Sequence, residues 1–340
     1  MSKRLWVLGS ADPEMERIEE LLRTVGEEYV HATRNGERVR GGDAYRCDPP
    51  VERGTHWIEC ASPGQAREMV IDHHRPGDPG YGRPPDDFLS ASSIGQVISE
   101  LARLGALPES WERLSGVPGA FPAGAFIDRT WGSASPRWLI GAGTWIVVPH
   151  ALILCAAADH CLAHAYRGLC PWVAPDELMH WRAESRAAHQ GRYAMEVLAD
   201  IERARAKLRT APLAVVWAEC PDCGEAAQAK YATEGIDWDG SCSIGGCYEG
   251  GNSSPGRVVA AEYKDMRGRH VPELPEASAR EGLCFIADGL PDPDGRVKVV
   301  CQSGTASQIR AFVDVWAPAQ GLVDVYGDPE RGIAGGYVQP

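Results

Sequence analysis

The sequence predicts an α/β protein with a parallel sheet in its N-terminal part and a smaller α/β unit at its C-terminal end. Two observations support this fold class. Short apolar strands alternate with helical segments through roughly the first hundred residues, and strands return after a long charged helical stretch. Strands that alternate with helices are typical of parallel sheets. We expect an N-terminal domain over 1–172, a helical connector over 173–212 and a C-terminal domain over 213–340.

In chain order, the first expected strand is Arg4–Gly9, and a helix follows over 17–25, where apolar residues recur at helical spacing. A later helix begins after Ser92, a residue type that caps helix N-termini. The other N-terminal strands that we expect are 29–33, 55–60 and a short one that ends at Val70-Ile71. The segment thus reads as repeated strand–turn–helix units.

Acids and histidines stand where these strands end. Glu14 and Glu16 follow the first strand, Glu59 ends a later one, and Asp72 and His73 follow Ile71. Parallel strands bring their carboxyl ends to one edge of the sheet, where open α/β sheets bind ligands. Taken alone, Asp12, Glu14 and Glu16 are better explained as a helix N-cap and first-turn acids that interact favourably with the helix dipole.

A further acid, Asp159, ends an apolar run that finishes in three alanines. A carboxylate buried there without a partner would be costly, so it either pairs with an arginine or binds a metal. His160 and His164 are four residues apart and are expected to share one helix face. They form either a second pair of ligands or, as we expect, a plain surface pair.

Composition narrows the possible functions. With 340 residues, 44% of them hydrophobic and 24% charged, the chain has the composition of a globular protein with a sizeable core. Its net charge of −13 argues against a long nucleic-acid footprint, which needs a basic stripe. A short anionic substrate bound through metal ions remains compatible, because clustered carboxylates then belong to the site.

Two features of the sequence indicate the cellular compartment and argue against a membrane-spanning segment. The eleven cysteines are an odd number and no secretory signal precedes them, which favours a reducing cytoplasm over a disulfide framework. The uncharged stretch 138–158 approaches the ~20 residues of a membrane span, but glycines and Pro149 interrupt it. We therefore expect a buried strand and helix there, and no membrane partner.

After the connector, the C-terminal domain is expected to hold strands at 214–217, 283–286 and 297–300 and a helix at 306–315. A cysteine-rich insert at about 218–252 has two pairs of cysteines at C-x2-C and C-x4-C spacing. Four thiolates at such spacing are typical of structural zinc, and free thiols are the alternative. These cysteines are Cys220, Cys223, Cys242 and Cys247.

The N-terminal residues resemble the motifs of the DHH phosphoesterase superfamily, which includes single-strand exonucleases, cyclic dinucleotide phosphodiesterases and family II pyrophosphatases. The range Asp72–His74 reads D-H-H literally. The range Ser10–Glu16 is similar to the first motif, H-x-N-P-D-x-D, when the prolines are aligned. Glu59 matches the lone acid of the second motif, and Asp159 the acid of the fourth.

The C-terminal domain is similar to the DHH-associated substrate domain. The range 295–303 looks like the superfamily's strand that ends in R-S, with Gln302 in place of the arginine. The range 327–336 looks like its terminal glycine motif, without the histidine. The resemblance implies that Ser303, Gly335 and Gly336 contact substrate.

By resemblance, 1–172 is a metal-binding catalytic domain that holds one or two Mn²⁺ or Mg²⁺ ions and activates a water to attack a phosphate ester. His74 and Arg75 would then neutralise the phosphoryl oxygens, and Asp72 would orient the histidines. The implied metal ligands are Glu14, Glu16, Glu59, His73 and Asp159.

The expected substrate is a small phosphorylated or nucleotide-like molecule. Ser10 stands where the superfamily has a histidine ligand. A catalytically weakened protein that binds a nucleotide or a protein partner is therefore the alternative function, and a zinc-stapled interaction module is a third. A monomer and a homodimer both remain open.

Overall fold

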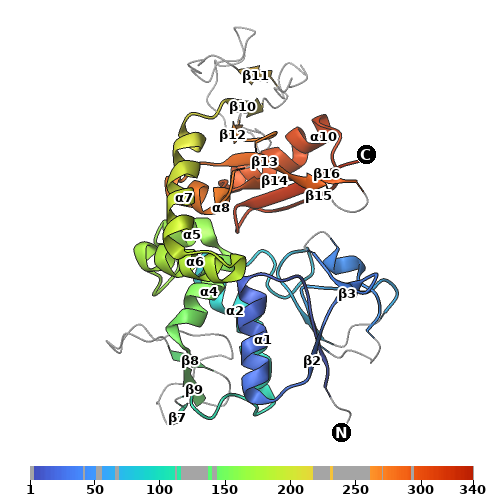
Figure 1. Ribbon diagram of the computed structural model, residues 1–340, viewed down its shortest axis with the longest axis vertical. Coiled ribbons are helices and arrows are strands. Elements are labelled where there is room, and N and C mark those ends of the chain that lie inside the picture. The colour runs from blue at the N-terminus through green and yellow to red at the C-terminus, as the bar shows by residue number, and fades with distance from the viewer. Residues whose placement is uncertain are drawn as a thin grey trace, which may run out of the picture. The chain divides into compact units, whose positions relative to one another are not determined.

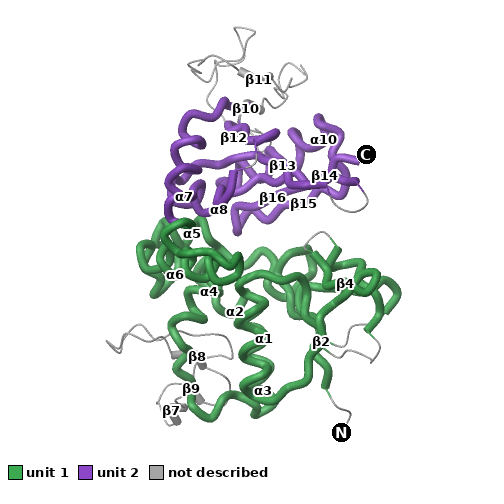
Figure 2. Tube along the Cα trace, in the orientation of Figure 1, with its two compact units in different colours: residues 1–197 green, residues 198–340 purple. Residues whose placement is uncertain are grey.

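The computed structural model describes residues 4–40, 43–50, 56–65, 69–111, 113–115, 137–139, 144–216, 230–232, 261–269, 271–291 and 295–339. It divides into two compact units, 1–197 and 198–340 (Figure 2). The division falls inside the expected helical connector, which contains α6, Pro175–Gln190, and α7, Ala194–Arg209. In the part of the chain that the structure describes, no helix has the length and apolar character to cross a membrane.

The first unit is built on a four-stranded parallel sheet in the order β2-β1-β5-β6. Figure 1 labels its edge strand β2 in the blue part of the ribbon. The short strands of this sheet are apolar where they are most buried: Trp6, Val7 and Leu8 are each at most 1% exposed, as are Trp57 and Ile58. The strand bounds are Trp6–Leu8 for β1, Tyr29–His31 for β2, His56–Ile58 for β5 and Met69–Ile71 for β6.

Helices pack around this sheet and against one another. Helix α1 contacts α3, α4 and α6, and α3 contacts β6. Asp12 caps α1 by accepting from Met15 N, and Ser92 caps α3 by accepting from Gly95 N, so both expected caps are confirmed. The helix bounds are Pro13–Val25 (α1), Phe88–Ala91 (α2), Ser93–Arg103 (α3), His150–His160 (α4) and Leu162–Tyr166 (α5), with 3₁₀ turns at Ala44–Arg46 and Pro85–Asp87.

Two smaller sheets complete the first unit. A two-stranded antiparallel ribbon pairs β3 with β4, and a three-stranded antiparallel sheet has the order β7-β9-β8. Strand β9 leads into α4, so the uncharged stretch 138–158 contains strand and helix as expected. Their bounds are Thr33–Arg34, Glu37–Arg38, Arg113–Ser115, Arg137–Leu139 and Thr144–Val147 for β3, β4, β7, β8 and β9.

The second unit is a seven-stranded mixed sheet in the order β11-β10-β12-β13-β14-β16-β15, in which only β12 and β13 run parallel. A core of aromatic and aliphatic residues that includes Tyr263, Phe312 and Trp316 lies between this sheet and its helices. The strands are Leu213–Val216, Lys230–Ala232, Ala261–Asp265, Phe285–Pro291, Val297–Gln302, Val323–Asp328 and Ile333–Val338 (β10 to β16).

The helices of this unit are α8, Leu274–Glu281, α9, Ala306–Ala311, and α10, Ala317–Ala319, with a π-helical turn at Phe312–Trp316 between the last two. The coarse prediction of an α/β chain with a parallel N-terminal sheet and a separate C-terminal α/β unit is confirmed. Strands β11, β12, β15 and β16 were not expected from the sequence. Two of these, β15 and β16, carry a glycine or an acid at positions where a strand pattern needs an apolar residue.

One local expectation is wrong. His160 and His164 do not share a helix face, because the chain leaves helical geometry at Cys161, with φ −147° and ψ 47°. His160 therefore ends α4 and is 1% exposed, whereas His164 belongs to the next short helix.

A candidate metal centre at the carboxyl edge of the parallel sheet

The carboxyl ends of β1, β5 and β6 stop at one level. Leu8 pairs with Ile58, and Ile58 with Ile71, so Gly9, Glu59 and Asp72 are the first residues beyond the sheet. Backbone hydrogen bonds continue one step further, from Gly9 N to Ile58 O and from Glu59 N to Ile71 O, both 3.0 Å. A Cβ on Gly9 would lie 2.7 Å from Glu59 O, so only glycine permits this close approach.

Glu59 is held in an uncommon conformation. Its φ of 50° lies in the left-handed region, which a residue other than glycine seldom adopts. The side chain is 6% exposed, and its Oε1 accepts no hydrogen bond within the described residues. Backbone strain of this kind is concentrated at functional sites, and a buried oxygen without a donor is costly unless something else binds it.

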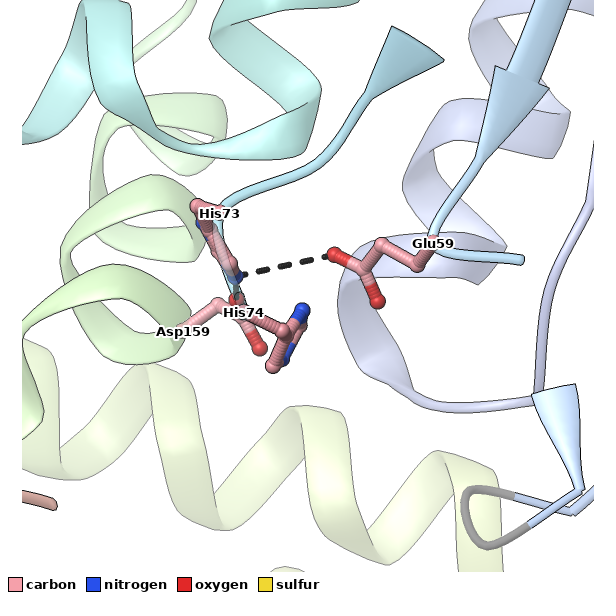
Figure 3. Close-up of side chains that lie close together, drawn as sticks. All are labelled: Glu59, His73, His74 and Asp159. Carbon is pink, nitrogen blue, oxygen red and sulfur yellow. Dashed lines mark ion pairs between the residues drawn. The ribbon is translucent and has the colours of Figure 1, made fainter. Parts of the chain in front are cut away.

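His73 faces Glu59 across the edge. Its Nε2 lies 3.7 Å from Glu59 Oε1 and 2.9 Å from Asp159 Oδ2, and its ring is fully buried. Figure 3 shows Glu59 pointing to His73 from the end of its strand, while Asp159 approaches from a helix. That helix is α4, where Asp159 is the residue before the last.

One ligand atom from each of Glu59, His73, His74 and Asp159 lies within 4.8 Å of the others. Two carboxylates and two imidazoles that converge in this way could hold a metal ion. Of the five metal ligands expected from the sequence, the structure brings Glu59, His73 and Asp159 into this group, and it adds His74.

Asp72 does not face this group but organises it. Its Oδ1 accepts from the backbone N of His73 and of His74, at 2.7 and 3.1 Å, and lies 3.0 Å from His74 Nδ1. Its Oδ2 accepts from Tyr45 Oη at 2.8 Å. The carboxylate therefore fixes the turn that carries both histidines and holds the Nδ1 edge of the His74 ring.

Two more contacts hold the same turn. The Gln96 side chain, from α3, accepts from Asp72 N and donates to Asp72 O. Gly80 lies so close to His73 that an added Cβ would be 2.7 Å from the His73 Cβ. The loop after the histidines thus folds back over them, and the turn is braced from both sides.

The acids at this edge carry more negative charge than their surroundings balance. Burial, together with the charges of Asp159 and Asp12, raises the pKa of Glu59 to about 8, even though His74 opposes the shift. Burial and the charge of Asp159 also raise the pKa of Asp12 to about 6. These raised pKa values indicate that the acids at this edge lack a neighbouring positive charge.

Asp72 behaves in the opposite way. Burial alone would raise its pKa, but the hydrogen bonds from His74 and Tyr45 and the charge of His74 lower it to about 2. Its negative charge is therefore already satisfied by the protein, as expected of a residue that orients others rather than binding a ligand.

Glu14 lies beside the group without belonging to it. Its Oε1 accepts from Ile94 N at the start of α3, and its Oε2 has no hydrogen-bond partner among the described residues. The side chain is 2% exposed, and burial with the charges of Asp159 and Glu59 raises its pKa well above the ordinary value. Its role as a ligand stays a prediction.

The structure does not bring Glu16 to the site. Its side chain is 45% exposed and its Oε1 lies 2.6 Å from His189 Nδ1 of α6. The reason is helical geometry, since residues two apart on α1 point to different sides: Glu14 faces inward and Glu16 outward. The motif spacing could not reveal this, because a motif expected in a turn lies partly on the helix.

Arg75, expected to contact phosphate, is exposed, and its guanidinium stacks on the Tyr45 ring with 3.3 Å between Cζ and the ring centroid. Tyr45 thereby connects Arg75 to Asp72. No sequence signal pointed to Tyr45, which lies in an isolated 3₁₀ turn. His160, which was expected to form a pair with His164, instead contacts His73, and its adjacency to Asp159 in the chain is the sequence signal that points to this position.

The expected substrate-contacting residues of the second unit have packing roles. Ser303 follows β14, with φ 61°, and its hydroxyl lies 2.8 Å from that of Ser278. Gly335 and Gly336 are inside β16, where a Cβ on Gly335 would be 2.5 Å from Tyr326 Oη and one on Gly336 3.2 Å from the Leu322 Cβ. Contact with substrate stays a prediction for all three.

The expected zinc site lies outside the described residues. This covers Cys220, Cys223, Cys242 and Cys247, together with most of the insert. Seven other cysteines are buried in the described part of the chain and form no disulfide there.

The fold and the site define a class: a two-unit α/β protein with a carboxylate–histidine group, able to hold a metal ion, at the carboxyl edge of a parallel sheet. Comparison with family models, with curated protein sequences and with solved structures gave no match. Function is therefore inferred from the geometry of this site together with the sequence.

Proposed function

We propose that this protein is a metal-dependent hydrolase of phosphate esters or phosphodiesters in a small nucleotide-like substrate. The observation that carries the proposal is the convergence of ligand atoms from Glu59, His73, His74 and Asp159 within 4.8 Å. Their place at the carboxyl edge of a parallel sheet is where α/β proteins bind ligands.

The residues present fit a divalent cation. Glu59 Oε1 and Glu14 Oε2 are buried oxygens that lack hydrogen-bond donors among the described residues, and the acids around them have raised pKa values. Carboxylate oxygens with imidazole nitrogen favour Mn²⁺ or Mg²⁺ over metals that prefer thiolates. Glu59, His73 and Asp159 would hold the ion, with His74 and Glu14 as further ligands.

A bound divalent ion supplies an activated water and charge stabilisation for displacement at phosphorus. The chain's own residues do the rest. Asp72 fixes the His73-His74 turn and orients the His74 ring, so that His74 is positioned either to complete the ligand set or to donate to a phosphoryl oxygen. Arg75, steadied on Tyr45, is an exposed cation near the same turn and would attract the anionic group.

The literal D-H-H turn and the acids at neighbouring strand ends support membership of the DHH phosphoesterase superfamily as part of this proposal. The acidic net charge of −13 supports a small substrate rather than a long nucleic acid. Substrate contacts through Ser303, Gly335 and Gly336 belong to the same proposal.

A second candidate is a non-catalytic relative that binds a nucleotide or protein partner. The position of Glu16 favours it, because that acid pairs with His189 and is lost to the site. Ser10 likewise offers no imidazole where the superfamily has one. The second candidate predicts ligand binding without turnover.

The test is hydrolysis of a panel of phosphate esters by the full chain with Mn²⁺ or Mg²⁺, and with EDTA in their place. The panel contains p-nitrophenyl phosphate, bis-p-nitrophenyl phosphate and short dinucleotides. We expect turnover that needs the cation and is lost in Glu59→Gln and Asp159→Asn. His180→Ala is the control, since His180 is exposed and bonds to Asp176 O within α6.

The outcomes separate the candidates. Cation-dependent turnover that disappears in both site variants but persists in the His180 control supports the hydrolase. Binding of Mn²⁺ and a nucleotide without turnover of any ester supports the second candidate. If the protein showed no turnover and did not bind Mn²⁺, both candidates would be contradicted.

A further inference from the structure

One face of the second unit's sheet gathers a lysine and two tyrosines. Lys298 of β14 stands directly opposite Tyr337 of β16, and Tyr326 of β15 stands opposite Gly335 of β16. Side chains alternate along a strand, so positions 335 and 337 lie on the same side of the sheet. All four residues therefore share one face.

This face is not the one that packs on the core with Phe312 and Trp316. Val299 and Cys301 of β14 belong to that core. Lys298 precedes Val299 in the same strand, so its side chain lies on the opposite side of the sheet. The lysine and the two tyrosines are thus separate from the helix-covered core.

Cations on this face lie over aromatic rings. Lys298 Nζ is 5.5 Å from the ring centroid of Tyr326, and Arg296 Cζ is 4.6 Å from that of Tyr337. A Cβ on Gly335 would be 2.5 Å from Tyr326 Oη, so the phenol of Tyr326 lies across that glycine. The Tyr326 hydroxyl is therefore over β16, the strand between its own strand and that of Lys298.

The two cations differ in their partners. Arg296 is 8% exposed and lies 3.4 Å from Asp324 Oδ2, on a side chain that is 64% exposed. Lys298 is partly buried and forms no ion pair with a carboxylate among the described residues. The chain has 47 acids against 34 lysines and arginines, yet the sheet places an aromatic ring beside this ammonium group. A cation–π contact offsets only part of the cost of taking the ammonium group out of water.

These groups have the chemistry of a phosphate site. Ammonium, guanidinium and phenol groups all donate hydrogen bonds, and such bonds are strongest to a charged oxygen. A phosphate monoester carries about −1.5 to −2 charges at pH 7 and presents three acceptor oxygens. It can therefore accept from several of these donors at once.

We propose that Lys298 and Tyr326, with Arg296 and Tyr337 beside them, form a site in the second unit for the phosphate group of a small molecule. The inference goes beyond the proposed hydrolase, because the site lies within one unit and requires no metal ion. None of the four belongs to the residues that the sequence led us to expect in contact with substrate.

The experiment is calorimetry of the full chain in EDTA with adenosine 5′-monophosphate (AMP), inorganic phosphate, adenosine and acetate. We expect AMP and inorganic phosphate to bind, more weakly as salt is added, and adenosine not to bind. Adenosine that binds as tightly as AMP, acetate that binds as tightly as inorganic phosphate, or no binding of either phosphate would overturn the inference.

Substitutions then test the lysine. Lys298→Met keeps the aliphatic stem and removes the charge, and we expect AMP affinity to fall by ~10-fold or more. Lys298→Arg restores a cation and should recover most of that loss, which a purely structural role would not require. The matched control is Lys207→Met, at an exposed lysine of α7, which should bind AMP as the wild type does.

The tyrosines are tested in two ways. Tyr326→Phe keeps the ring under Lys298 and removes the hydroxyl, so we expect a smaller loss of AMP affinity, ~3-fold. In the wild type, the ring ¹³C resonances of Tyr326 and Tyr337 should shift as inorganic phosphate is added. Resonances that stay unchanged while phosphate binds would overturn the inference without any substitution at the site.

Arg75 in the first unit is the competing anion contact, so Arg75→Gln is measured under the same conditions. AMP binding that is lost in Arg75→Gln and unchanged in Lys298→Met would assign the phosphate to the first unit and overturn the inference.

The result is separable from the proposed function. Phosphate binding that depends on Lys298, without turnover of any ester, would contradict the hydrolase and leave this site standing. Cation-dependent turnover by a chain whose phosphate binding does not depend on Lys298 would support the hydrolase and overturn this site.

Discussion

Strand β5 carries an acid–histidine pair at each of its ends, and the two pairs differ in charge balance. At its start, His56 Nε2 lies 3.0 Å from Glu100 Oε1, and Arg103 donates twice to the same carboxylate, at 2.7 and 2.6 Å. At its end, Glu59 faces His73 at 3.7 Å, with no arginine or lysine paired to it among the described residues.

The electrostatic consequence is opposite at the two ends. Hydrogen bonds from Arg103 and His56 overcome burial and lower the pKa of Glu100, whereas burial and neighbouring acids raise the pKa of Glu59 to about 8. Both glutamates are 6% exposed. A buried acid beside a histidine is therefore not enough to indicate a site: the unbalanced end is the one that calls for a cation.

The largest expected difference concerns metal affinity. Asp159→Asn removes a charged ligand from the unbalanced end, and we expect Mn²⁺ affinity to fall by ~100-fold or more, since losing even an outer partner costs 10- to 100-fold. Glu100→Gln, at the balanced end, should leave the affinity unchanged. Calorimetry on the folded variants makes the measurement, and an equal loss in both would erase the distinction between the two ends.

The second difference is one of sign in stability. In the metal-free protein at pH 7, Glu59→Gln removes an unbalanced buried acid and should raise the free energy of unfolding by about 2 kcal/mol. Glu100→Gln breaks a satisfied pair and should lower it by about 1 kcal/mol. Urea unfolding measures both, and a destabilising Glu59→Gln would show that this carboxylate is already satisfied.

The third difference is the response of stability to added cation. A ligand that binds only the folded state stabilises it by about 2.7 kcal/mol at a hundred times its Kd. We expect the wild type and Glu100→Gln to gain this stability in Mn²⁺, and Asp159→Asn to gain little. Thermal unfolding with and without Mn²⁺ provides the comparison, and an equal gain in Asp159→Asn would place the ion elsewhere.

The smallest effect is on pH dependence at the balanced end. The folded-state pKa of Glu100 is below its ordinary 4.5, so its contribution to stability is complete above pH 4.5 and is lost as pH falls through the lowered value. The difference between wild type and Glu100→Gln, about 1 kcal/mol or less given the exposed Arg103, should shrink from pH 7 to pH 3. Urea midpoints at the two pH values test this.

Only part of this contrast between the two ends of β5 could be predicted from the sequence. Apolar strands followed by an acid predicted the parallel sheet and the edge at which Glu59 and His73 meet, because strand ends in register are a local consequence of pattern. In the sequence, His56 and Glu59 are both simply polar residues at the ends of one apolar strand. Only the structure shows that Arg103 balances one end of the strand and that Glu59, at the other end, has no such partner among the described residues.

The incorrect predictions for Glu16 and His160 have a common cause. Glu16 stands two residues from Glu14, but the turn of α1 sends it to His189. His160 was expected on the surface, but at the end of α4 it is buried against His73. Both outcomes depend on where a helix begins or ends, which periodicity defines least well.

The most direct test of the central claim, that the unbalanced end of β5 binds a divalent cation, is a count of bound Mn²⁺ by electron paramagnetic resonance of the full chain. The account predicts saturable loss of the free Mn²⁺ signal with the wild type and with Glu100→Gln, and almost none with Asp159→Asn. Equal binding by all three proteins, or none by the wild type, would contradict it.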